Sequence, residues 1–109
     1  MVYFLRNTRD NTIKIGWSKS PSVRQMTLQT GNADALSIEY VIDSVDESFE
    51  HHTHEVCSRY HIQGEWFRGD AISNHLLKHP WFVENMKPYS QWLKEQTNAI
   101  HSSNAGISV

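Results

Sequence analysis

Three residues with useful side-chain chemistry stand near the start of the chain. Tyr3 lies in VYFLR, Lys14 in TIKIG, and Arg24 shortly after Pro21. A phenol or an amine can remove a proton when nearby cations lower its pKa, and a guanidinium offers a fixed fork of donors to anionic oxygens. Each residue alone is ordinary, because strand tyrosines pack in cores, strand lysines line solvated edges and helix arginines lie on surfaces. Only their occurrence together, in this order, suggests a site.

Glu50 and His54 form a second candidate pair, one helical turn apart in the segment SFEHHTHE. This spacing places both side chains on the same face of a helix. Such pairs are common on solvated faces, but a carboxylate is also the kind of hard oxygen ligand that Mg²⁺ prefers.

The same segment contains the residues of an alternative metal site. Zn²⁺ ligand types follow one another at intervals of four, three and four residues, at Glu50, His54, Cys57 and His61. Four ligands along three helical turns span about 16 Å at ~1.5 Å per residue, which is too far for one tetrahedral ion. Zinc binding by two or three of them stays open.

The elements that must position these residues begin with a hairpin. Apolar residues alternate in TIKIG, and the turn residues of NTRDN separate it from VYFLR, which predicts a β-hairpin over the first sixteen residues. Ser20 and Pro21 predict a helix start with the serine hydroxyl as its cap, and Gly31 predicts the end of that helix. LSIEYVID, residues 36–43, predicts a third strand.

Helices are predicted for most of the remaining chain. Ser44 and Glu47 have the spacing of a capping box, which predicts a helix over residues 45–60, and GEWF predicts a turn with a short extended piece. Asp70 predicts the cap of a helix that ends before Pro80, and a last helix is expected from Pro88 to about Gln96. The fold class is therefore α/β, a small three-stranded antiparallel sheet flanked by helices, with a C-terminal helical extension.

Composition is consistent with a single small domain. The 109 residues are 39% hydrophobic and 20% charged, which is typical of a soluble globular protein. No apolar stretch approaches the roughly 18 residues of a membrane span, so we expect no membrane association. Cys57 is the single cysteine, which excludes an internal disulfide and predicts a reducing, cytoplasmic setting.

Charge is unevenly distributed along the chain. The net charge is −2, which argues weakly against a nucleic-acid partner. Residues 1–31, however, carry five basic side chains and only Asp10 as an acid, a local balance of +4. The N-terminal third could therefore receive a polyanion despite the overall sign, although an ordinary mixed surface explains the same numbers.

Several short motifs together resemble the GIY-YIG nuclease superfamily, most closely its phage-type branch, which is shared with meiotically up-regulated domains. These are VYF, KIG, GWSKSPSVR, TLQTGN, the E-x3-H pair and GEWF, spread over residues 1–68. The sequence departs from the family pattern in three places. Only Tyr3 of the first motif is kept, Lys14 replaces a tyrosine in the second, and Leu28 stands where a histidine often follows the arginine.

The resemblance implies a fold and an activity. Small standalone members among mobile elements and phage satellites nick DNA, so we expect an endonuclease acting on double-stranded DNA as a monomer. Residues 1–70 would form the nuclease core, residues 71–97 a helical extension of the same domain, and residues 98–109 a mobile tail. A catalytically inactive DNA-binding module of the same fold is the alternative.

The resemblance also implies the site. Its catalytic residues would be Tyr3, Lys14, Arg24 and Glu50, and its substrate contacts Gly16, Ser18, Lys19, His54 and Glu65. Glu50 would bind Mg²⁺, with Mn²⁺ as a substitute, and the arginine would neutralise charge on the phosphate. Gly16 would leave space for the phosphate backbone. Whether Tyr3 or Lys14 is the general base stays open.

The aromatic and basic segment HPWFVENMKPYSQWLKE is open to two interpretations. Aromatic side chains at this density mostly pack a core. Its three lysines would alternatively allow the segment to contact DNA. These are Lys78, Lys87 and Lys94, interleaved with Trp81, Phe82, Tyr89 and Trp92.

Overall fold

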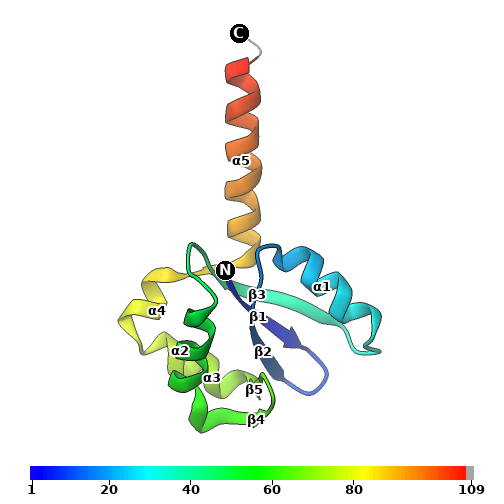
Figure 1. The fold of residues 1–109 in the computed structure, drawn as a ribbon, viewed down its shortest axis with the longest axis vertical. Helices are drawn as coiled ribbons and strands as arrows, with labels where there is room; N and C mark the ends of the chain where they lie inside the picture. Colours follow the sequence, from blue (N-terminus) through cyan, green and yellow to red (C-terminus); the bar gives the residue numbers. More distant parts are fainter. Residues whose placement is uncertain (108–109) are drawn as a thin grey trace.

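A six-stranded antiparallel sheet, in the order β4-β5-β2-β1-β3-β6, organises the chain in the computed structural model, which describes residues 1–107 (Figure 1). The strands are β1 Val2–Asn7, β2 Thr12–Trp17, β3 Leu36–Ile42, β4 His61–Gln63, β5 Trp66–Arg68 and β6 Met86–Pro88. The three predicted strands are therefore the central ones, and the expectation of a three-stranded sheet is wrong. Each added strand has three residues, too few for an alternation of apolar and polar side chains to be recognised.

The predicted hairpin is confirmed. Strands β1 and β2 pair antiparallel, with Tyr3 opposite Gly16 and Leu5 opposite Lys14. Asn11 in the connecting turn has a φ of 55°, a left-handed conformation that asparagine tolerates better than most residues. Strand β3 pairs with the other side of β1, so β1 lies at the centre of the sheet.

Helices cover both faces of the sheet (Figure 1). They are α1 Pro21–Thr30, α2 Ser48–Val56, α3 Gly69–Leu77, α4 Pro80–Asn85 and α5 Tyr89–Ile107, with a 3₁₀ turn, η1, at Ser58–Tyr60. One buried cluster joins Val2, Phe4, Ile13 and Ile15 to residues of α2, α3 and α4. A second, on the opposite face, joins Tyr3 and Leu5 to residues of β3, α1 and the start of α5. The two faces of the hairpin thus separate two cores.

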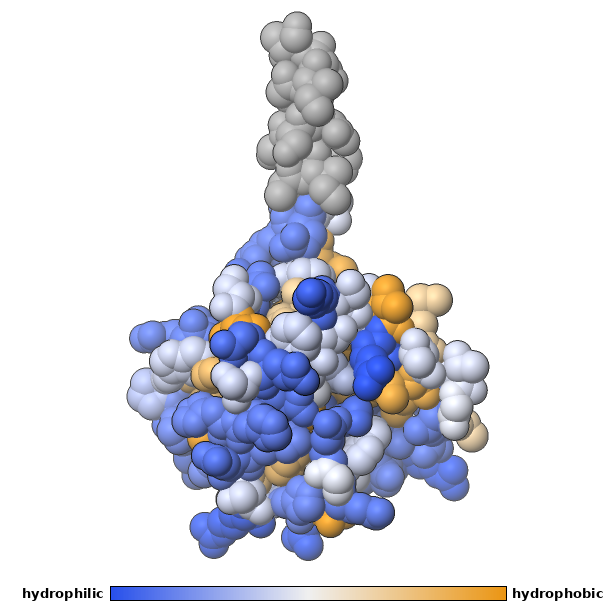
Figure 2. Space-filling model, viewed as in Figure 1, coloured by the Kyte–Doolittle hydropathy of each residue, from blue (hydrophilic) through white to orange (hydrophobic). Residues whose placement is uncertain are grey.

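The start of α1 is only partly as predicted. Pro21 occupies the first turn and Gly31 follows the last helical residue, as the sequence indicates. The Ser20 side chain makes no capping hydrogen bond, and Gly31 has a φ of −92°, so neither residue uses the expected capping geometry. Val23 and Met26 of α1 are exposed. Figure 2 shows apolar residues beside hydrophilic ones on the side of the molecule where Figure 1 places α1.

The predicted start of the second helix is wrong. Ser44 has a φ of 58° and lies in a turn, so it cannot cap a helix there. Helix α2 begins at Ser48, whose amide donates to the Asp46 carboxylate at 3.0 Å. The helix also ends early, at Val56, after which the chain forms η1 and β4 instead of continuing to residue 60.

The C-terminal segment contains one helix more than predicted. Helix α3 begins at Gly69 without a side-chain cap, so Asp70 lies within its first turn and does not cap it. The helix ends before Pro80 as expected, but this proline then begins α4. Helix α5 continues to Ile107 and points away from the sheet (Figure 1), whereas the sequence predicts its end near Gln96. The last two residues of the predicted tail, 108–109, lie outside the described part.

Candidate functional site

An ion pair between Lys14 and Glu65 lies at the outer edge of β2. The Lys14 ammonium is 2.6 Å from the Glu65 carboxylate, and it lies 5.9 Å from the centre of the Trp66 ring. The lysine side chain is only 13% exposed, so it is not the solvated edge residue that strand lysines usually are. Glu65 lies in the turn between β4 and β5, and this turn places it beside Lys14 of β2, although the two residues are 51 positions apart in the sequence.

The edge of β2 is open at this point because β5 is short. Strand β5 pairs with Thr12, Ile13 and Lys14 only, and beyond them the Ile15 amide donates to the Glu65 carbonyl at 3.0 Å. The Ile15 carbonyl is then available to a side chain. His54 of α2 forms a hydrogen bond with this carbonyl, and its Nε2 atom lies 2.9 Å from the oxygen. Because a carbonyl can only accept a hydrogen bond, Nε2 carries the proton.

Helix α2 brings Glu50 to the same edge. The Glu50 carboxylate lies 3.7 Å from His54 Nε2, and its side chain is 15% exposed. The predicted pairing of these two residues on one helical face is therefore confirmed. We call Lys14, Glu50, His54 and Glu65 the edge cluster.

The two carboxyl groups of the edge cluster, Glu50 and Glu65, lie close enough to shift each other's pKa. Burial raises the pKa of Glu50 to about 7, and a hydrogen bond to Glu65 and the charge of that carboxylate add to the shift. Burial alone would raise the pKa of Glu65 as well, but hydrogen bonds from Lys14 and Glu50 hold that pKa below its ordinary value. Glu50 is therefore the carboxyl group of the pair that binds a proton more readily, and Glu65 is the one that keeps its charge more readily.

Tyr3 and Gly16 lie side by side on the face of the hairpin that also carries Lys14. A Cβ atom at position 16 would be 2.3 Å from the Tyr3 hydroxyl oxygen, far closer than atoms can approach. Gly16 therefore provides space for the Tyr3 ring and not for a phosphate. The Tyr3 side chain is 2% exposed, which fixes its ring against the strand.

The remaining predicted site residues lie on or before α1. Arg24 is exposed on that helix, and within the described residues its side chain makes no ion pair. Lys19 is exposed, and the Ser18 hydroxyl accepts from the Ser20 amide at 3.0 Å. The structure thus gathers four of the nine predicted residues into the edge cluster, pairs Tyr3 with Gly16, and leaves these three apart.

The alternative zinc site is not formed. Cys57 is fully buried, and burial raises the pKa of its thiol to about 12, which opposes the thiolate that zinc requires. His61 is 2.7 Å from the Gly64 carbonyl, and it follows the end of α2 instead of lying on it. Across the described residues, no group of three histidine, cysteine, aspartate or glutamate side chains is placed to hold a metal ion.

Comparison with protein-family models matches the T5orf172 domain over residues 1–94. The chain belongs to the T5orf172 domain family. No curated protein and no solved structure matches it. The edge cluster, the Tyr3–Gly16 pair and α1 all lie inside the matched span.

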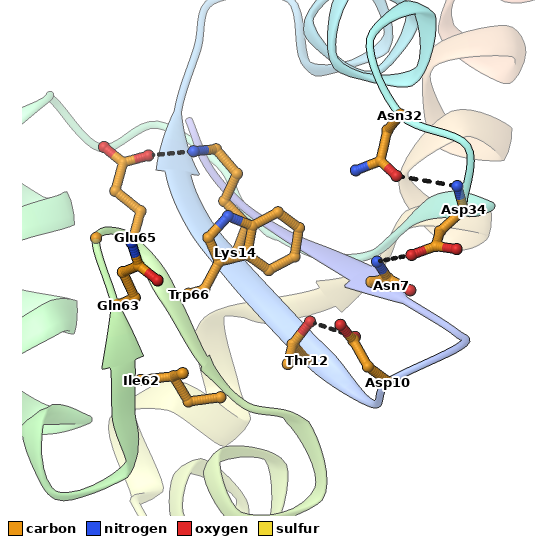
Figure 3. A pocket seen from close by; sticks show the side chains of 11 residues that line it. Asn7, Asp10, Thr12, Lys14, Asn32, Asp34, Ile62, Gln63, Glu65 and Trp66 are labelled. Atoms are coloured by element: carbon orange, nitrogen blue, oxygen red, sulfur yellow. Dashed lines mark hydrogen bonds and ion pairs between the residues drawn. The ribbon is translucent and has the colours of Figure 1, made fainter.

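A groove of about 750 Å³ crosses the Tyr3 face of the T5orf172 domain (Figure 3). One wall is the β4–β5 turn with Gln63 and Glu65, and the other is the α1–β3 connection with Asn32 and Asp34. Lys14 lies between them, so the groove opens beside the edge cluster. Sequence reasoning missed it, because no motif marks two loops that meet only in three dimensions.

The C-terminal aromatic residues of the T5orf172 domain mainly pack. Phe82 is buried in the first cluster, while Tyr89 and Trp92 stack with ring centres 5.8 Å apart and pack against the second. Lys87 forms an ion pair with Glu95 at 2.8 Å. No described helix is long and apolar enough to cross a membrane.

Proposed function

We propose that this T5orf172 domain is a metal-dependent DNA endonuclease of the GIY-YIG type, which cuts one strand in each binding event. The observation that carries the proposal is the edge cluster, where two carboxyl groups in hydrogen-bond contact lie beside a lysine at an open sheet edge. Hydrolysis of a phosphodiester requires an activated water, neutralisation of charge on the phosphate and assistance to the leaving oxygen. The edge cluster, together with Tyr3 and Arg24, would supply residues for each task.

The donor set of the cluster fits Mg²⁺. Two neighbouring carboxyl groups repel each other when both are charged, and a bound divalent cation would reduce that repulsion. Mg²⁺ is commonly bound through one or two carboxylates, completed by water and substrate phosphate, so three protein ligands are not needed. Glu50 and Glu65 would hold the ion, with Mn²⁺ as a substitute. When bound, it would lower the pKa of a water and neutralise charge on the phosphate.

Lys14 and Tyr3 are the two candidates for activating the water. The ion pair with Glu65 holds the Lys14 ammonium beside the carboxyl groups, where it would also contact a phosphate oxygen. Substitution of each residue tests which of them orients or deprotonates the water. Arg24, exposed on α1, is free to supply a second cation when DNA lies across that helix.

Incubation with supercoiled plasmid tests the proposal. In Mg²⁺ we expect open circles to appear first, because one site cuts one strand, and EDTA should prevent the reaction. Glu50→Gln should not cut, whereas Glu84→Gln, which changes an exposed carboxylate on α4, should cut like the wild type. DNA binding without any cutting would favour the inactive DNA-binding module, and linear product without an open-circle intermediate would overturn the single-strand mechanism.

A further inference from the structure

Ile15 of β2 is bonded to both elements that carry a carboxyl group of the edge cluster. Its amide donates to the Glu65 carbonyl at 3.0 Å, and its carbonyl accepts from Nε2 of His54 at 2.9 Å. The Ile15 side chain is fully buried, which fixes this residue within the sheet. One buried residue therefore anchors both the β4–β5 turn and helix α2.

Helix α2 has few directional contacts with the sheet. Phe49 and Val56 pack against the first buried cluster, but apolar packing is not directional and resists small shifts of a helix only weakly. Thr53 is buried, and its hydroxyl donates to the Phe49 carbonyl within the same helix. Across the described residues, His54 is the only α2 side chain that is hydrogen-bonded to a strand. This bond therefore sets the position of α2 along the β2 edge.

The His54 ring is itself held in place. Its centre lies 5.0 Å from that of the Phe67 ring, edge to face, and Phe67 is buried in β5. Only 23% of the His54 side chain is exposed. Because Nε2 carries the proton that binds the Ile15 carbonyl, this atom has no lone pair for a metal ion. Nε2 therefore binds the sheet and is not a metal ligand.

The bond at Ile15 also controls where Glu50 lies. Glu50 precedes His54 by one helical turn, so the two side chains share a face of α2. The Glu50 carboxylate is 3.7 Å from His54 Nε2, and it is in hydrogen-bond contact with Glu65. Hydrogen bonds weaken steeply away from their preferred distance and angle, so a small shift of α2 would separate the two carboxyl groups.

We propose that His54 is a positioning residue, which holds Glu50 against Glu65 through Ile15 and so prepares the two carboxyl groups for a divalent cation. Partners of this kind fix the orientation of metal ligands, and their loss typically weakens metal binding by about 10- to 100-fold. The inference rests on the proposed function, because it takes Glu50 and Glu65 as the metal ligands.

Binding of Mn²⁺ to the DNA-free protein tests this role, with free Mn²⁺ measured by electron paramagnetic resonance. His54→Leu keeps apolar packing against Phe67 and removes the donor, so we expect the Kd for Mn²⁺ to rise by roughly tenfold or more. In His54→Gln the amide nitrogen can donate to the same carbonyl, so the Kd should stay within about threefold of the wild-type value.

His75→Leu is the matched control. His75 Nε2 lies 2.9 Å from the Val56 carbonyl, a bond of the same kind outside the edge cluster. Each leucine variant leaves one backbone carbonyl without its partner, so the Tm in EDTA should fall in both. The affinity for Mn²⁺ should fall only in His54→Leu, which separates positioning from a general loss of stability.

Three results would overturn the positioning role. They are a wild-type Kd for His54→Leu, an equal loss of affinity in His75→Leu, and a His54→Gln variant as weak as His54→Leu. Plasmid cleavage by the wild type in Mg²⁺ separates this role from the proposed function. The expected Kd pattern without cleavage keeps the positioning role and overturns the nuclease. Cleavage with unchanged binding by His54→Leu does the reverse, and a wild type that binds no Mn²⁺ overturns both.

Discussion

The ammonium of Lys14 lies 2.6 Å from the carboxylate of Glu65, although the two residues are 51 positions apart. This ion pair fixes the β4–β5 turn against β2, and it holds Glu65 within reach of Glu50 on a different element. The position of the second carboxyl group therefore depends on Lys14.

Glu65→Gln should weaken metal binding without preventing folding. The amide keeps the size of the side chain and removes one charged oxygen ligand, so we expect the Mg²⁺ concentration for half-maximal cleavage to rise roughly 10- to 100-fold. Titration of plasmid cleavage with Mg²⁺ measures the change. An unchanged titration would exclude Glu65 from the metal site.

Glu50→Gln should stabilise the metal-free protein at neutral pH. Because the folded protein raises the pKa of Glu50 from 4.5 to about 7, it holds more protons there than the unfolded chain between these values. The free energy of unfolding therefore decreases as the pH rises from about 4.5 to about 7. Glutamine at position 50 does not ionise, so the variant should not show this decrease. In EDTA we expect the Tm of the variant to exceed that of the wild type by roughly 4 °C or more at pH 8, and to equal it at pH 4.

A Tm difference that is the same at pH 4 and pH 8 would contradict the burial of an ionisable Glu50. Glu84→Gln changes an exposed carboxylate and should shift Tm little at either pH.

Gly16→Ala should destabilise the protein. Its methyl group would meet the Tyr3 ring, with 2.3 Å to the hydroxyl oxygen and 2.4 Å to the ring carbon that bears it. Since the ring lies in a packed core, we expect the free energy of unfolding to fall by about 1–3 kcal/mol. Gly31→Ala is the control, because nothing lies within 4 Å of its added methyl group. Equal stability of the two variants in urea would show that the Tyr3 ring moves freely.

Tyr3→Phe and Lys14→Met separate the two candidates for the general base. Phenylalanine keeps the packing of the Tyr3 ring and removes only the hydroxyl, so it should abolish most cleavage with little change in Tm. Lys14→Met breaks the ion pair with Glu65 and should mainly weaken phosphate and metal binding. Cleavage rates at saturating and limiting Mg²⁺ distinguish these effects, and full activity of both variants would contradict the site.

Arg24→Ala should lower the cleavage rate by about 10²-fold, the loss typical of one group that stabilises transition-state charge. Arg24→Lys should restore only part of it, because an ammonium lacks the bidentate fork. The side chain is exposed, so neither variant should change Tm. A wild-type rate for Arg24→Ala would mean that the arginine never reaches the phosphate.

The sequence is sufficient to predict the elements whose signal is local. The alternation of polar and apolar residues in TIKIG predicts the second strand of the hairpin, and Pro21 predicts the start of α1. Ser44 shows the limit of such signals, since its capping-box spacing is correct but its backbone is left-handed. Residue spacing does not encode the backbone conformation of the residue that would form the cap.

The site is less predictable than the fold. Glu50 and His54 are found from their helical spacing, whereas the contact between Glu50 and Glu65 depends on a three-residue strand that no periodicity reveals. Gly16 shows the same limit. The sequence shows that this residue lacks a side chain and suggests space for a phosphate, but the space is filled by the Tyr3 ring from another strand.

The short length of β5 leaves the β2 edge without a strand partner beyond Lys14. An edge of this kind can template the addition of a strand from another molecule. At Ile15 both backbone groups are already bonded, the amide to the Glu65 carbonyl and the carbonyl to the His54 ring. The histidine of the edge cluster therefore occupies a hydrogen-bonding position that an added strand would need.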